Sequence, residues 1–144
     1  MMKKILSVML AVSVVVPFAA YAVELKAGES YSLRREEIIN SNLYVSAGMV
    51  TVAGIVGGDL TAAGGNVLVT GTVGQDALIA GGTVSISGIT GGDLRIAGGT
   101  VTISQPVGGD VVVFGGDTHI VSGTVVGGDV IVFGGRVSID GRVN

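Results

Sequence analysis

The chain has 144 residues, with eleven acidic and eight basic side chains and a net charge of −3 at pH 7. It contains 26 glycines, three tyrosines, three phenylalanines and no cysteine or tryptophan. This composition indicates a single domain of short strands and tight turns rather than helices. It also excludes disulfide bonds and argues against a nucleic-acid partner, because clustered Lys and Arg are missing.

Residues 1–22 have the pattern of a secretory signal peptide. A basic start, MMKK, is followed by the uncharged apolar run ILSVMLAVSVVVPFAA and by Ala20-Tyr21-Ala22, a small-x-small cleavage site. We expect cleavage before Val23, which leaves six basic residues (8 − 2) against eleven acidic ones and a net charge of −5. The alternative is an uncleaved membrane anchor, because the apolar run is just shorter than a comfortable span.

Residues 23–36, VELKAGESYSLRRE, hold six of the seventeen charged residues of the mature chain and show no repeat. We interpret them as an N-terminal cap, which repeat proteins use to cover the end of their core. Residues 37–144 then form the repeat domain. Its last coil is incomplete, because GRVN at 141–144 starts another coil and stops.

The repeat is visible when the chain is aligned with itself. The third position of each Gly-Gly-Asp phrase, or its equivalent, recurs at intervals of 17, 17, 17, 17 and 19 residues, at Asn42, Asp59, Asp76, Asp93, Asp110 and Asp129. A second Gly-Gly anchor keeps the same steps, which places the two extra residues between Gly116 and Gly127. A fixed period of this length is typical of a solenoid.

Each unit contains three short apolar pieces separated by glycine-rich corners, as in GIVGGDLTAAGGNVLVT at 54–70. None of these pieces could form a free-standing sheet, but coils stacked at about 4.8 Å can pair them in parallel. The fold predicted is therefore all-β, a triangular parallel β-helix of about six coils. Four ladders should face inward; they are Leu43, Leu60, Ala77, Leu94, Val111 and Val130; Val45, Ala62, Ile79, Ile96, Val113 and Val132; Val50, Val67, Val84, Val101 and Val137; and Val52, Val69, Ile86, Ile103, Ile120 and Ile139.

The corner residues have structural explanations. Glycine is expected there because the chain turns sharply, often with φ > 0, and because a Cβ would collide with the neighbouring coil. We expect each Asp to cap its corner through its own backbone, as in an Asx turn. The alternative is a divalent cation held along the column of carboxylates, at Asp59, Asp76, Asp93, Asp110 and Asp129.

Catalytic chemistry has few candidates. The single imidazole, His119, takes an outward position, and Ser122 is the serine within reach for a triad. Nothing resembling an oxyanion site accompanies them, so we interpret His119 as a surface residue and predict no enzyme, no catalytic residues and no cofactor. One His and no Cys argue against a His/Cys metal centre.

The coil GTVGQDALIAGGTVSISG at 71–88 and its neighbours resemble the bactofilins, the polymer-forming cytoskeletal family. The likeness covers about residues 38–143, and the export signal points to the exported subset of that family. The resemblance implies a right-handed triangular β-helix that assembles end to end without nucleotide. The export signal and the richer Gly-Gly content depart from the cytoskeletal members, so the scaffold is expected but a cytoskeletal role is not.

We therefore expect a non-catalytic, self-assembling scaffold at the bacterial cell envelope, in the periplasm or on the cell surface. Its partners would be further copies of itself, and membrane or cell-wall components. The candidate self-assembly residues are Phe114, Phe133, Val137, Ile139 and Val143. The two phenylalanines stand where earlier coils have alanine, and they either fill the core at a widened corner or form a lateral contact patch.

Two alternatives stay open. The chain could be a surface adhesin or carbohydrate-binding solenoid, which needs a binding face rich in aromatic or polar side chains. It could also be the N-terminal fragment of a longer, membrane-anchored envelope protein.

Overall fold

The computed structural model describes residues 24–144, so the predicted signal peptide lies outside the described residues. All regular structure in 24–144 is β-strand, and this part of the chain has no helix that could cross a membrane. The long strands are β1 (Glu24–Leu33), β3 (Leu43–Val52), β5 (Leu60–Val69), β7 (Ala77–Ile86), β8 (Leu94–Ile103), β9 (Val111–Ile120) and β11 (Val130–Ile139). The short strands are β2 (Ile38–Ile39), β4 (Ile55–Val56), β6 (Thr72–Val73), β10 (Val125–Val126) and β12 (Arg142–Val143).

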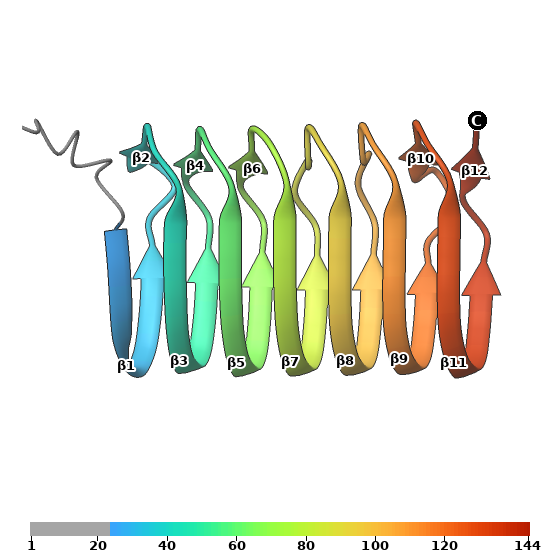
Figure 1. Ribbon diagram of the computed structural model, residues 1–144, viewed down its shortest axis with the longest axis horizontal. Helices are drawn as coiled ribbons and strands as arrows, with labels where there is room; N and C mark the ends of the chain where they lie inside the picture. Colours follow the sequence, from blue (N-terminus) through green and yellow to red (C-terminus); the bar gives the residue numbers. More distant parts are fainter. Residues whose placement is uncertain (1–23) are drawn as a thin grey trace, which may run out of the picture.

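The strands wind into a parallel β-solenoid (Figure 1). Each long strand turns back on itself midway, at a Gly-Gly pair in β5 to β11, so that it has a front arm, such as residues 60–63, and a back arm, such as residues 67–69 (Figure 1). The back arm is followed by the bend that leads to the short strand, which we call the third corner. The Gly-Gly-Asp phrase after the short strand, which we call the Asp corner, leads into the next front arm. The second and third apolar pieces are thus one continuous strand, because pairing with the next coil runs through Gly64 and Gly81.

The register matches the 17-residue period along the whole stack. The long strands form one seven-stranded parallel sheet in which, for example, Leu60 pairs with Ala77 and Ala77 with Leu94. The short strands form a three-stranded and a two-stranded sheet, and bridges at Thr90 and Val107 connect them into one further ladder. The solenoid therefore has about seven coils, one more than predicted.

The additional coil comes from the segment interpreted as a cap. β1 pairs in parallel with β3 from Glu24 to Leu33, so residues 24–33 belong to the repeat rather than lying outside it. The charged residues conceal this repeat, because Lys26 stands in the register position of the buried Val45. An edge coil tolerates such residues, and β1 is at the edge of the sheet formed by the described residues.

The core is the interior of the tube. The four predicted ladders are buried from β3 to β9, and their last members on β11 are partly or largely exposed. A fifth inward ladder, which the sequence analysis did not assign, comes from the short strands and closes the third side; its members are Ile39, Val56, Val73, Thr90, Val107 and Val126. Hydrophobic burial between stacked coils therefore holds the solenoid together.

Thr118 breaks one of these ladders, since it stands between Val101 and Val137 in the register. Its side chain is 2% exposed, and its Oγ1 has no hydrogen-bond partner. A buried hydroxyl without a partner destabilises a fold, so Thr118→Val should raise the free energy of unfolding by about 1 kcal/mol. Urea unfolding followed by circular dichroism measures this, with the outward Thr102→Val as the neutral control.

The corner glycines are required by close approach and not by φ. Among residues 24–144, Gly123 is the only residue with positive φ, at 88°, so the expected φ > 0 at the Gly-Gly corners is wrong. A Cβ built on Gly81 would lie 2.8 Å from the backbone oxygen of Gly64 in the coil below, so the predicted collision is confirmed.

The two extra residues of the long repeat lie in the third corner. The step from Ile103 to Ile120 is 17 residues, but that from Val107 to Val126 is 19, so the insertion follows β9. It forms a turn in which the Thr124 N–H donates to the Val121 carbonyl at 3.1 Å. Gly123 supplies the positive φ that the third residue of such a turn needs.

Candidate assembly site

The C-terminal coil presents an apolar end to solvent. Within the described residues no coil covers β11 and β12, and Val137, Ile139 and Val143 are 42%, 44% and 43% exposed. Ile120 and Val126, which stand one coil earlier beneath Ile139 and Val143, are fully buried. The outer edge of β11 also carries backbone groups that pair with no strand in 24–144. This end has the apolar surface and the open hydrogen-bonding edge on which another coil could stack.

The opposite end differs chemically. A hollow of about 370 Å³ at the β1 end is lined by Lys26, Tyr31, Leu33 and Glu37, among others. Lys26 and Tyr31 stand in the register positions of the buried Val45 and Val50. Charged and polar groups at ladder positions make a sheet edge less favourable for a purely apolar partner. The two ends of the solenoid are therefore not interchangeable.

Phe114 and Phe133 lie side by side on the outside of the tube. They are register partners on β9 and β11, their ring centroids are 5.0 Å apart, and the rings are nearly parallel at 9°. The two side chains are 56% and 58% exposed. The two phenylalanines therefore do not fill the core. Of the two interpretations that the sequence left open, core filling is excluded and a surface patch remains.

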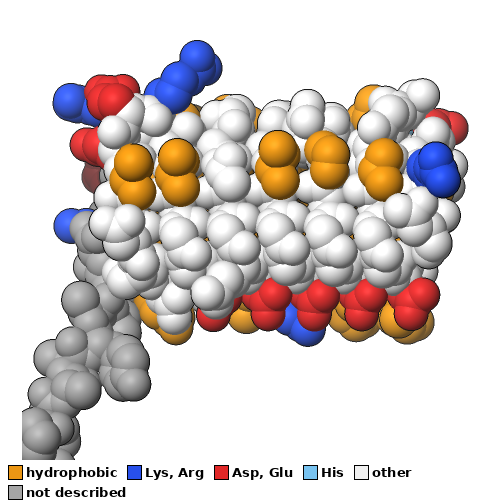
Figure 2. All heavy atoms as spheres, turned by 90° about the horizontal axis from the view of Figure 1, so that it is seen from above, with side chains coloured by type: hydrophobic (Ala, Val, Ile, Leu, Met, Phe, Trp, Pro, Cys, Tyr) orange, Lys and Arg blue, Asp and Glu red, His pale blue; other side chains and the backbone are white. Residues whose placement is uncertain are grey.

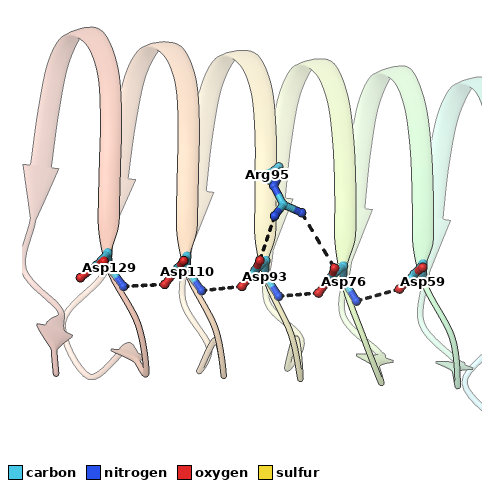
Figure 3. Close-up of polar contacts among 6 residues, drawn as sticks. All are labelled: Asp59, Asp76, Asp93, Arg95, Asp110 and Asp129. Carbon is cyan, nitrogen blue, oxygen red and sulfur yellow. Dashed lines mark hydrogen bonds and ion pairs between the residues drawn. The ribbon is translucent and has the colours of Figure 1, made fainter.

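The aspartates form a hydrogen-bonded ladder along the Asp corner (Figure 3). The Oδ1 atom of each Asp accepts the backbone N–H of the Asp one coil later, at 2.8 to 3.0 Å from Asp59 through Asp129. The expectation that each Asp caps its own backbone is therefore wrong. Coil spacing is the reason, because it places the next N–H directly at the carboxylate.

The first member of the ladder shows what the carboxylate contributes. Asn42 Oδ1 accepts the Asp59 N–H at 2.8 Å, in the same way as the aspartates do. A neutral amide therefore suffices for this bond, which supports a structural role.

Arg95 lies beside the aspartates. Its Nη2 bonds Asp93 Oδ2 at 2.8 Å, and its Nη1 lies 3.9 Å from Asp76 Oδ2 (Figure 3). Among residues 24–144 no group of three or more acidic, His or Cys side chains is arranged to hold a metal ion.

The structural role of the aspartates can be tested at Asp110, whose Oδ1 accepts the Asp129 N–H at 2.8 Å. Asp110→Ala should lower the free energy of unfolding by about 1 kcal/mol, because it removes the acceptor for that N–H. Asp110→Asn should leave the free energy unchanged, since it keeps the acceptor as Asn42 does. Urea unfolding of both variants distinguishes the acceptor from the charge. An equal loss of unfolding free energy in both variants would show that the negative charge of Asp110, and not its acceptor oxygen, stabilises the fold.

His119 joins a hydrogen-bonded cluster between the last two coils. Its Nε2 lies 2.9 Å from Asp140 Oδ2, and the Ser138 hydroxyl donates to the same oxygen at 2.9 Å. The Ser138 bond first, and then the His119 bond, lower the pKa of Asp140. Ser122 does not bond His119. The serine of the cluster contacts the carboxylate and not the imidazole, so the arrangement is not a serine-activating relay.

Sequence reasoning missed an outer aliphatic row on the short strands. Figure 2 shows hydrophobic side chains in line along this face, interrupted once, with a row of acidic side chains running beside them. The exposed aliphatic residues of the row are Ile38, Ile55, Ile89 and Val125. Each of the four stands two residues before the Gly-Gly-Asp phrase or its equivalent and directly before a buried residue of the fifth ladder, so in the sequence the outward and the inward residue form one short apolar pair. Known protein families, curated proteins and solved structures offer no match to this chain.

Proposed function

We propose that this protein is a non-catalytic, exported scaffold of the bacterial cell envelope that assembles through its solenoid ends. The observation that carries the proposal is the apolar coil of β11 and β12, which no other coil of residues 24–144 covers and whose ladder positions are buried in every preceding coil from β3 onward. A second copy stacking there would bury Val137, Ile139 and Val143 and continue the parallel pairing. The resemblance of the repeats to bactofilins, and the signal-like N-terminus, support the same proposal.

The two ends of the solenoid differ chemically, so the product of assembly depends on which ends meet. If the apolar end accepts the β1 end of another copy, the contact does not close, and a filament grows. If two apolar ends meet, the product is a dimer, which extends only when the β1 ends also pair. Either contact uses the same residues, Val137, Ile139 and Val143, so they are the residues to test.

The experiment is sedimentation of the chain from Val23 onward over a concentration series, with negative-stain electron microscopy of the same samples. We expect species that grow with concentration. The double substitution Val137→Lys and Ile139→Lys should leave only monomer, because two charges would have to be buried in the contact. The matched control, Ile89→Lys with Val125→Lys, adds the same charge to a side face and should assemble normally. A wild-type monomer at every concentration would refute the proposal.

A carbohydrate-binding solenoid is the second candidate, and the exposed Phe114–Phe133 pair is the observation that favours it. Sugars need hydrogen-bonding groups beside the aromatic surface. The groove next to Phe114 offers Thr61 and Arg95 among otherwise apolar side chains, and Arg95 is already bonded to Asp93. Assembly therefore accounts for more of the surface than sugar binding does.

A further inference from the structure

The rim of the C-terminal coil carries charged side chains around its apolar centre. Asp129 lies at the Asp corner, Arg136 follows the Gly-Gly pair of β11, and Asp140 lies at the third corner. Arg142 follows on β12, and all four side chains are exposed. A partner for this end must therefore match a pattern of charges as well as an apolar surface.

The register fixes which residues would meet this rim if β1 of a second copy continued the stack. Leu33 and Ile139 belong to the same ladder, so Leu33 would lie over Ile139. Arg34 and Asp140 are the next residues along the chain, and they would therefore stand over one another. An exposed guanidinium would meet an exposed carboxylate at the third corner.

Two further contacts of this kind follow from the register. Glu29 directly precedes the residue that would lie over Arg136, and Glu37 directly precedes the residue that would lie over Arg142. Residues 35–36, an Arg and a Glu in the turn of the third corner, add no net charge. The β1 end therefore has acidic, basic and acidic side chains in the order in which the apolar end has basic, acidic and basic ones.

We propose that the apolar end receives the β1 end of a second copy in continuous register, so that copies join head to tail. This inference rests on the proposed function and selects one of its two modes. The unlike ends of such a contact do not close on themselves, so the product is a filament with a direction. Opposite charges across a contact fix the register of the partners and suppress wrong pairings.

Two apolar ends do not have the same complementarity. Such a pair is related by a twofold axis in the plane of the contact, and where the two three-sided coils coincide this axis passes through one corner. That corner then faces the same corner of the other copy. Asp129 would face Asp129, Arg136 would face Arg136, or Asp140 would face Asp140, so each arrangement brings like charges together.

Backbone bonding at the Asp corner also has a direction. Asp110 Oδ1 accepts the Asp129 N–H, and the Val111 N–H donates to the Asp129 carbonyl, both at 2.8 Å. Each coil thus offers one acceptor and one donor to the coil that follows. For Asp129 and Val130 there is no following coil within residues 24–144. A copy that continues the stack in the same direction would present a backbone N–H and a carbonyl in the order that these two groups need.

Lys26 is the charged side chain that a head-to-tail contact would enclose, because it shares a ladder with Val132. Lys26 and Glu37 line the same hollow of about 370 Å³ at the β1 end. A charge taken out of water needs an opposite partner, and Glu37 lies in the hollow with it. Enclosing these two charges should make the contact weaker than the junctions within the solenoid, so assembly should depend on concentration.

Exchange of charges between the ends tests the direction, in the chain from Val23 onward. One variant carries Glu29→Lys with Arg34→Glu at the β1 end, and the other carries Arg136→Glu with Asp140→Lys at the apolar end. In sedimentation, either variant alone should need a concentration about tenfold higher than the wild type to assemble, because like charges then meet. An equimolar mixture of the two should assemble at the wild-type concentration, since each altered end meets its altered complement.

Thr70→Glu with Gln105→Lys is the matched control. It adds one charge of each sign at exposed side-face positions and should assemble as the wild type does. Circular dichroism checks that each variant folds. Because Asp140 is also bonded between the last two coils, a second exchange with Glu29→Lys and Arg136→Glu alone repeats the test with those bonds intact.

Two results would overturn the inference. If the Glu29→Lys, Arg34→Glu variant assembles at the wild-type concentration, the β1 end takes no part and apolar ends pair with each other. If the mixture assembles no better than its components, the altered ends do not face one another. Failure of the proposed function is recognised separately, because the wild type itself would then stay monomeric at every concentration.

Discussion

Leu94→Ala should lower the free energy of unfolding by about 3 kcal/mol, the middle of the range for a leucine removed from a packed core. Leu94 is fully buried at the centre of the first inward ladder, between Ala77 and Val111. Ala77 is small, so the space left by the leucine would extend into a region with few atoms to fill it. Urea unfolding followed by circular dichroism measures the loss.

Leu78→Ala is the matched control for this substitution. Leu78 lies one coil earlier, points outward and is 55% exposed. Its truncation should change the free energy of unfolding by less than about 0.5 kcal/mol, as is usual for surface positions. Similar losses in the two variants would contradict the assignment of inward and outward rows.

Gly91→Ala should cost about 3 kcal/mol, because its Cβ would meet the backbone carbonyl of Gly74 in the coil below. A backbone oxygen within a parallel stack cannot move aside as a flexible side chain can. Five successive coils have glycine at this position, namely Gly57, Gly74, Gly91, Gly108 and Gly127, and the last coil of 24–144 has Asn144 there. The first coil has Asn40 instead, and no short strand of 24–144 lies beneath it.

Gly57→Ala provides the comparison for Gly91→Ala. The Cβ built on Gly57 lies 3.4 Å from the nearest atom, the Ile39 carbonyl oxygen, which is an ordinary contact. The same substitution at the same place in the repeat should therefore be nearly neutral. Thermal unfolding of both variants checks this, and a large loss at Gly57 would mean that conformation rather than close approach selects glycine.

The period and the apolar alternation were sufficient to predict the architecture. Four ladders followed from residues two apart in the sequence and 17 apart in the repeat, because a strand sorts its side chains between two faces and a stack repeats that choice. Val137 and Ile139 were also proposed from the sequence as self-assembly residues, and both side chains are exposed, because no further coil of residues 24–144 lies on β11.

Features that depend on contacts between coils could not be predicted in the same way. β1 lacks the glycine phrase and has Lys26 at an inward position, so its membership of the stack is recognisable only from its pairing with β3. The acceptor role of each Asp toward the following coil depends on the coil spacing. The His119–Asp140 contact joins residues 21 apart, which a 17-residue comparison does not align.

The candidate assembly surfaces were predicted in part. Phe114 and Phe133 were identified as exceptions to an alanine row, but a pattern that alternates apolar residues could not decide between core and surface for them. Their outward position follows from the pairing of β8, β9 and β11, which places the alanine row on the outside of the front arms. The groove beside them is a property of three coils together and has no signal in any one of them.

The third corner holds two residues in most coils but four in the first and the sixth, where Glu37 bonds back to Arg34 and Thr124 to Val121. In both places the flanking ladders continue without a change of register. Length variation at this corner is therefore uncoupled from stacking, since the added residues leave the tube as a turn. Such a corner is a point of insertion, where a recognition loop or an epitope could be added while the coils on either side keep their pairing.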